Sequence, residues 1–248
     1  MATWSALFSG FRSPVQQSDR MVVAADVDDQ SLDDLAETFI VCFAEGTLIE
    51  TTDGLRRVEA LRPGDMILTQ DHGPQPLRWR GSQRIALSRE NLHLRPILIR
   101  AGALGEDMPQ QDLRVSPQHR VLVRSAVARR MFGAEEVLVA AIHLVGLPGI
   151  TVDQAVGHIV YLHLLMDRHE IVFSNGAATE SLFTGPQAMR SISAAARAEI
   201  FQIFPQLEAI GAAMELPEPA RPLITGRRGR QLAQRHMDNR RPIYLETL

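Results

Sequence analysis

The sequence predicts a mainly β domain built from many short strands, and three observations support this prediction. Short apolar runs recur between residues 42 and 183, separated by Gly, Pro, Asp and Asn. No helical pattern lies between these runs, which argues against βαβ units and favours a sandwich or a barrel-like fold. The chain has 248 residues, 45% of them hydrophobic, which is enough for a sizeable core and for one or two domains.

The predicted strands are placed by their turns. The β-branched run 47–51 ends at Asp53-Gly54, a hairpin signal. Pro63-Gly64 marks a later turn, and Asn175-Gly176 marks the end of the series. Between these turns we expect strands at 56–58, 66–69, 77–85, 96–100, 113–123, 137–144, 150–153, 159–166 and 170–174.

Composition divides the chain into three parts. Residues 1–41 carry two Arg against seven acidic residues and few large apolar side chains, so an acidic, loosely structured leader is expected there. Residues 42–183 form the predicted β domain. Residues 184–248 form a helical, Arg-rich extension.

Within the extension, an Ala-rich stretch predicts a helix with Ser193 as its N-cap, and Pro205 interrupts the helical pattern. Residues 221–241 carry seven Arg and one Asp. This segment either docks on the acidic leader or forms a solvated tail, and the solvated tail is the favoured reading.

Composition also excludes several kinds of chemistry. All 26 basic residues are Arg, so Schiff-base chemistry, a P-loop lysine and a lysine general base are excluded. Cys42 is the only cysteine, so no intramolecular disulfide forms and no site has two Cys ligands. The net charge of -3 gives no general attraction to nucleic acid or membranes.

Targeting signals are absent from the pattern. No run of 18 apolar residues predicts a membrane span, and no standard secretory signal stands at the N-terminus. The sequence therefore leaves open a cytoplasmic location or export without a standard signal.

Cys42 is the candidate nucleophile, at the junction between the leader and the first strand. A reactive Cys needs a thiolate or a base, whereas a lone Cys is more often a small buried hydrophobe. His119, in the run Ser116-Pro117-Gln118-His119, is the best-placed histidine, and Ser116 three residues earlier can address the same small site. His169, before the last predicted strand, is a second candidate.

The other six histidines carry weaker signals. Three are expected to be solvated, and three lie in apolar runs as core or rim residues. Their scatter argues against a metal site, so neither a metal nor a cofactor is expected. The solvated set is His72, His93 and His236, and the core set is His143, His158 and His163.

Three blocks in order resemble the Hint domain, the self-processing module of inteins and Hedgehog proteins. Cys42-Phe43-Ala44-Glu45-Gly46-Thr47 resembles its opening block, and Ser116-Pro117-Gln118-His119 resembles the second intein block. Residues 161–181, with His169 and Asn175-Gly176, resemble the C-terminal blocks. Among Hint-domain proteins, the chain most resembles the bacterial ones. Its residues 184–210 resemble the Ala- and Leu-rich C-terminal helical segment of those proteins.

The resemblance implies a self-processing reaction with no cofactor. Cys42 would attack the carbonyl of Val41 and form a thioester by an N-to-S acyl shift. His119 would protonate the departing amide nitrogen, and Ser116 would orient the scissile peptide. His163 lies near the position where the family places an Asp or His, and would assist the second step. The substrate would be the chain's own N-terminal segment, and water or a small nucleophile would accept the acyl group.

The C-terminal junction departs from the splicing pattern. Splicing inteins end in His-Asn, and the corresponding pair here is Glu180-Ser181, which cannot form a succinimide. Full splicing is therefore not expected. Sterol transfer of the Hedgehog type is not expected either, because no sterol-recognition segment is evident.

Two alternatives stay open. The chain is either an autoprocessing domain, acting once on itself rather than turning over, or a degenerate Hint scaffold that serves as a binding or structural module. The short leader favours the scaffold reading. A Cys–His hydrolase acting on other molecules ranks last, because the Cys42 context is not papain-like.

Overall fold

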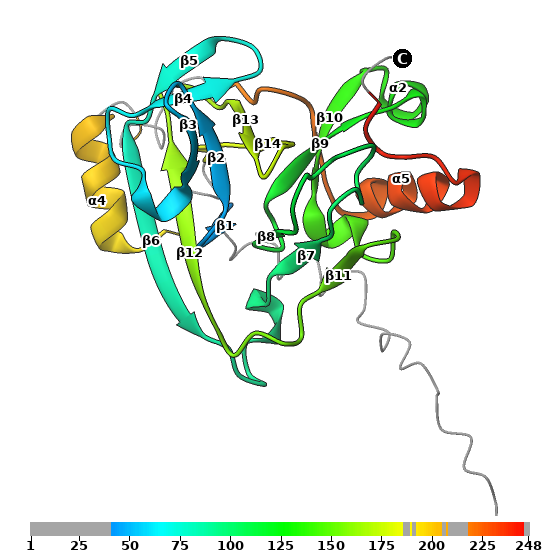
Figure 1. The fold of residues 1–248 in the computed structure, drawn as a ribbon, viewed down its shortest axis with the longest axis horizontal. Helices are drawn as coiled ribbons and strands as arrows, with labels where there is room; N and C mark the ends of the chain where they lie inside the picture. The colour runs from blue at the N-terminus through cyan, green and yellow to red at the C-terminus, as the bar shows by residue number, and fades with distance from the viewer. Residues whose placement is uncertain (1–40, 186–188, 190–191, 205–206, 208–217, 246–248) are drawn as a thin grey trace, which may run out of the picture.

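The computed structural model of the protein describes residues 41–185, 189, 192–204, 207 and 218–245. Within these residues the strands form two sheets, and three α-helices pack around them (Figure 1). The predicted mainly β fold with a C-terminal helical part is confirmed. Residues 1–40 of the acidic leader and Pro205 lie outside the described residues.

The smaller sheet holds the start of the β domain. It has six described strands, and the short strand β1 lies between β8 and β12, antiparallel to both. The order across the sheet is β11 (Ile150–Val152), β7 (Ile97–Ile99), β8 (Leu113–Val115), β1 (Phe43–Ala44), β12 (His158–Leu165) and β6 (Trp79–Ala86).

The larger sheet has nine described strands, and only the pair β10 and β15 is parallel. Its path is β15 (Leu223–Ile224), β10 (Glu136–Ala140), β9 (Arg120–Arg124), β14 (Ala177–Glu180), β13 (Ile171–Ser174), β2 (Leu48–Thr51), β4 (Met66–Thr69) and β5 (Gly73–Pro76), with β3 (Gly54–Arg57) paired to β2. Apolar side chains from both sheets, such as Ile97, Leu113, Ile49 and Val121, meet in one buried core.

Three chain crossings between the sheets are close to the predicted catalytic residues. The chain leaves the smaller sheet after β1, after β8 and after β12, and each time it enters the larger sheet. The second crossing contains Ser116 and His119, where the His119 N–H donates to the Ser116 carbonyl at 3.0 Å. The predicted single strand 113–123 is therefore wrong, because this turn, which contains Pro117, divides it into β8 and β9.

Hairpin signals in the sequence are confirmed. Asn175 and Gly176 have φ of 48° and 79°, and they join β13 to β14 as the favoured two-residue turn requires. The Asn175 side chain accepts from the Leu48 N–H at 2.7 Å and donates to the Asp112 carbonyl at 2.9 Å. Both ends of this amide are therefore held by the backbone.

Two elements differ from expectation. The second half of the predicted strand 137–144 is the 3₁₀ helix η4 (Ala141–Leu144), which continues directly from β10. The helix α2 (Ala126–Phe132) was not predicted, although its Ser125 N-cap and its left-handed Gly133 C-cap are ordinary sequence signals. Two further 3₁₀ turns, η2 (Val58–Ala60) and η3 (Leu92–Leu94), join strands.

The predicted helix in the extension is α4 (Ala194–Ile203), and Ser193 caps it by accepting from the Ala196 N–H at 3.2 Å. Figure 1 shows α4 beside β6 at one end of the molecule. Its Ile200 is buried in an apolar cluster with Trp79 of β6 and with Val41.

The prediction of a solvated Arg-rich tail is wrong. This segment contains the helix α5 (Gly226–Asn239), which packs against η4 and α2 at the other end of the molecule (Figure 1). Gly229, Leu232, Ala233 and His236 recur at helical spacing and are buried, so the helix is amphipathic and its apolar face decides its position. His236, also predicted to be solvated, is buried beside Ser125, 3.0 Å from the Ser125 Oγ.

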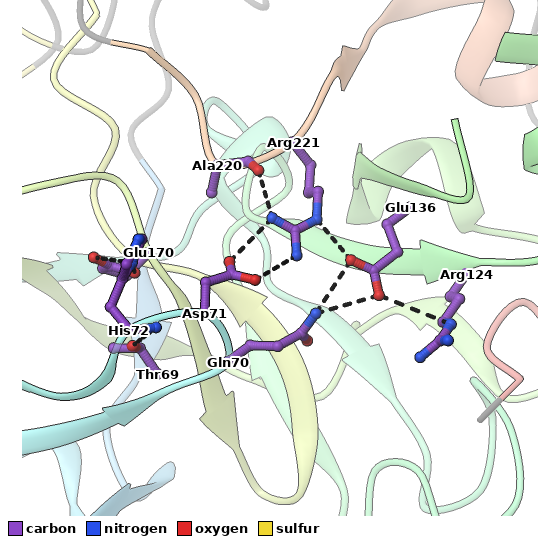
Figure 2. Close-up of polar contacts among 9 residues, drawn as sticks. All are labelled: Thr69, Gln70, Asp71, His72, Arg124, Glu136, Glu170, Ala220 and Arg221. Carbon is purple, nitrogen blue, oxygen red and sulfur yellow. Dashed lines mark hydrogen bonds and ion pairs between the residues drawn. The ribbon is translucent and has the colours of Figure 1, made fainter. Parts of the chain in front are cut away.

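The chain before β15 is fixed to the β domain by Arg221. Its guanidinium contacts the Asp71 carboxylate at 2.7 Å and the Glu136 carboxylate at 2.6 Å (Figure 2). Paired hydrogen bonds to two carboxylates raise the pKa of Arg221. In the same view, His72 contacts Glu170 at 2.9 Å, and its side chain is exposed to solvent as we expected.

Candidate active site around Cys42

Cys42 enters the protein interior immediately before β1. Phe43 pairs with Leu162 of β12 on one side and with Val115 of β8 on the other. These pairings bring the Val41–Cys42 peptide between two strands that are far away in sequence. The Cys42 side chain is 5% exposed, and Val41 is 6% exposed.

Ser116 holds the backbone of Cys42 from both sides. Its Oγ accepts a hydrogen bond from the Cys42 N–H at 3.0 Å, and its own N–H donates to the Cys42 carbonyl at 2.9 Å. The Cys42 nitrogen is the atom that would leave in an acyl shift. Ser116 therefore fixes the backbone of Cys42 on both sides of the residue.

His163 contacts both the Val41 carbonyl and the Cys42 thiol. Its Nδ1 lies 2.8 Å from the Val41 carbonyl oxygen, and its Nε2 lies 3.6 Å from the Cys42 Sγ. A carbonyl oxygen only accepts hydrogen bonds, so Nδ1 carries the ring proton and donates a hydrogen bond to the Val41 carbonyl oxygen. In the neutral ring Nε2 is then the acceptor, and it faces the thiol.

Burial determines the protonation of the thiol and of His163. Burial raises the pKa of the Cys42 thiol far above its usual range, and a hydrogen bond from the Ser116 side chain opposes this only in part. Cys42 is therefore a neutral thiol at physiological pH, and any reaction at its sulfur would require a base. Burial also lowers the pKa of His163, which keeps its ring neutral and able to accept a proton.

His119 is completely buried, and its ring packs edge-on against Phe43 with the centroids 4.4 Å apart. Among the described residues, neither ring nitrogen has a hydrogen-bond partner of regular geometry. Burial lowers the pKa of His119 to about 4, while the charge of Glu180 and the backbone of Cys42 act in the opposite direction. A buried ring nitrogen without a hydrogen bond destabilises the fold. Buried groups with strongly shifted pKa values are common at functional sites.

His169 lies in a different network. Its Nε2 is 3.0 Å from the Glu180 carboxylate, and its Nδ1 accepts from the Ala220 N–H at 3.1 Å. Arg120 also contacts Glu180 through its backbone and its guanidinium. Glu180 is fully buried, and its pKa is lowered by Arg120 and His169 against the effect of burial. Three of the five predicted residues, Ser116, His119 and His163, thus lie around the fourth, Cys42, whereas His169 joins the segment before β15 to the β domain.

In the part of the chain that the structure describes, no three His, Cys, Asp or Glu side chains are placed to share a metal ion. No helix among those residues is long and apolar enough to cross a membrane.

Two sheets that hold a cysteine, a serine and two histidines around one peptide bond define an autoprocessing type of domain. The family model of the Hint domain matches residues 41–186, more than half of the chain. The chain belongs to the Hint domain family.

Solved structures with a similar fold are inteins and intein-like domains. The bacterial intein-like domain from Clostridium thermocellum is 13% identical, with a TM-score of 0.37, and the match covers 56% of this chain and 96% of that one. The MchDnaB-1 intein is 13% identical at a TM-score of 0.34, covering 56% and 98%. The gp41-1 intein is 10% identical at 0.33, covering 56% and 97%. A comparison with curated proteins finds no match.

Proposed function

We propose that the protein cleaves its own chain at Val41–Cys42 through a thioester. The observation that supports this most directly is the placement of His163, which contacts the Cys42 thiol and the Val41 carbonyl with its two ring nitrogens. One neutral imidazole can then accept the thiol proton and donate a hydrogen bond to the carbonyl that is attacked.

The first step is the attack of the Cys42 thiol on the Val41 carbonyl carbon. The thiol proton moves to His163 Nε2, the Cys42 Sγ bonds to the Val41 carbonyl carbon, and negative charge develops on the carbonyl oxygen. The hydrogen bond from His163 Nδ1, at 2.8 Å, is placed to stabilise that charge. Because the nucleophile and the carbonyl are neighbours in the chain, no separate substrate has to be bound.

The second step breaks the peptide bond. The C–N bond of the tetrahedral intermediate opens, and the Cys42 nitrogen takes up a proton. His119 is the expected donor, since it adjoins Cys42 and Phe43 and its ring nitrogens are not engaged elsewhere among the described residues. The products are a Val41 thioester on Cys42 Sγ and a free Cys42 amine. Water or a small nucleophile then takes the acyl group and restores the thiol.

The C-terminal half reaction of splicing is not part of this proposal. The Glu180 carboxylate is bound by Arg120 and His169, and the Ser181 Oγ accepts from the Glu170 N–H at 2.9 Å. Neither side chain is an amide that could cyclise. Ala220 and Arg221 also attach the extension to the β domain.

Intact-mass spectrometry of the full chain tests the proposal. Incubation with dithiothreitol, which attacks thioesters, is expected to speed release of residues 1–41 and to leave one product that begins at Cys42 and ends at Leu248. No release under any condition would favour the inactive scaffold. A fragment that begins near Phe183, or a leader joined to the tail, would show that the C-terminal junction reacts.

The rate is expected to depend on pH through His119. With a pKa of about 4, only roughly one molecule in a thousand carries a protonated His119 at pH 7. The acid form becomes more abundant as pH falls, so the acyl shift should accelerate from pH 8 toward acidic pH. It should slow again once His163 is protonated and can no longer act as a base.

This prediction is measured by incubating samples at each pH and trapping the thioester with a brief hydroxylamine pulse at one common pH. His119→Ala should reduce the rate by about 10² to 10⁴ and remove the acceleration at low pH. A circular-dichroism melt accompanies each variant. Unchanged cleavage per folded molecule, together with a large loss of stability, would make His119 a structural residue.

A further inference from the structure

Trp79 lies against the imidazole of His163. The two rings are nearly parallel, at 9°, with their centroids 6.4 Å apart, an offset-stacked arrangement. Gly81 stands opposite His163 on the paired strand and two residues after Trp79, so Trp79 and Gly81 share one face of β6. A Cβ at position 81 would come within 2.1 Å of the indole. The glycine therefore leaves the space that the indole occupies.

The indole of Trp79 is held by the helix α4. Trp79 is 6% exposed, and its ring N–H donates to the Glu199 carboxylate of α4 at 2.7 Å. A hydrogen bond to a charged acceptor is stronger than a neutral one and fixes the orientation of the indole. Glu199 itself is exposed on α4, so its carboxylate binds the buried indole only at the edge that carries the ring N–H.

The same helix covers the residue before the scissile bond. Val41 is buried in one apolar cluster with Trp79, Leu165 and Leu182 of the β domain and with Ile200 and Phe204 of the extension. The extension thus contacts both Val41, the residue that carries the acyl group, and the Trp79 ring that stacks on His163. Nothing in the proposed chemistry uses these contacts directly.

We propose that Trp79 and Glu199 are positioning residues for the acyl shift, through which the docked helix α4 holds the His163 imidazole in its reactive orientation. This inference rests on the proposed function. The stacked indole limits tilting of the His163 ring, and the ring must keep its orientation to contact the Val41 carbonyl and the Cys42 Sγ together. Small displacements of reacting groups reduce rates by up to about a hundredfold.

The indole also keeps water away from His163. The titratable groups that face His163 are Cys42, on the strand β1 side, and His119, in the turn between β8 and β9; Glu199 lies beyond the indole. Burial is the main cause of the lowered pKa of His163. Removal of the indole should therefore raise that pKa toward its ordinary value and move the acid limit of cleavage to higher pH.

The test compares thiol-induced release of residues 1–41 from four full-length variants. Glu199→Ala removes the acceptor, and Trp79→Leu removes the stacked ring. Glu199→Gln keeps an acceptor oxygen, and Gln202→Ala is a matched control on the exposed face of α4. We expect Glu199→Ala to slow release about tenfold and Trp79→Leu up to a hundredfold. Glu199→Gln and Gln202→Ala should stay within about threefold of the wild type.

Two further measurements separate positioning from stability. The pH profile of release and the NMR titration of the His163 ring should both shift to higher pH in Trp79→Leu. If the wild type releases its leader and all four variants match it, the inference is overturned while the proposed function stands. If Trp79→Leu loses thermal stability but keeps the wild-type pH profile and rate per folded molecule, Trp79 is structural and the inference is also overturned. If the wild type releases nothing, the proposed function fails and the kinetic role fails with it.

Discussion

Cys42→Ala is expected to abolish release of residues 1–41. The thiol lies between Ser116, which binds the Cys42 backbone, and His163, whose Nε2 is 3.6 Å from the Cys42 Sγ. Alanine keeps the small apolar volume in the cluster that Cys42 shares with Ala44, Ile159 and Tyr161, so the fold should be retained. The measurement is intact mass after incubation with dithiothreitol.

Cys42→Ser is the informative companion to this variant. A hydroxyl can form an ester in place of the thioester, but it is a weaker nucleophile, so slow release is expected where alanine gives none. Equal release from the wild type and from Cys42→Ala would show that cleavage at this junction does not use the thiol.

His163→Ala is expected to reduce the rate of the acyl shift by about 10² to 10⁴, the usual contribution of a general acid or base. The reason is that burial raises the pKa of the Cys42 thiol, and the His163 Nε2 lies 3.6 Å from the Cys42 Sγ, where it can accept the thiol proton. Loss of the imidazole also removes the donor to the Val41 carbonyl.

His163→Gln separates the two roles of this ring. A glutamine amide can still donate to the Val41 carbonyl, but it cannot accept the thiol proton, so the rate should recover only in part. His158→Ala is the matched control, since His158 lies on the same strand at an exposed position. Release from His163→Ala at the wild-type rate, with the control also unchanged, would contradict the role of His163 as base.

The local fold was largely readable from the sequence because its signals are local. Asp53-Gly54 and Asn175-Gly176 predict hairpins through the backbone angles that Asn and Gly tolerate, and both hairpins are present. Ser193 predicts its helix start through its own hydroxyl. The resemblance of three short blocks to the Hint domain was sufficient to identify the family, which the match over residues 41–186 confirms.

The site was only partly readable, because its contacts join distant strands. His163 belonged to an apolar run typical of a core strand, and only the pairing of β12 with β1 brings it to Cys42. His169 was the second candidate after His119, yet the structure places His169 against Glu180 and Ala220. Trp79 and Gly81 are two residues apart, which places them on one face of a strand. Only the pairing of Gly81 with His163 in the sheet brings the indole to the imidazole.

The sequence by itself determined the class of fold, the family, the single thiol and the lack of an amide at the C-terminal junction. These follow from residue identity and from short-range backbone preferences. Tertiary structure alone decided which histidine faces the thiol and where the extension packs. The arginines of α5 suggested a solvated tail, but burial of Leu232, Ala233 and His236 places the helix on the β domain. Such outcomes depend on contacts between distant segments, such as the 3.0 Å hydrogen bond from the Gly226 N–H to the His143 Nε2, which lies 83 residues away in sequence, and no local pattern encodes that partner choice.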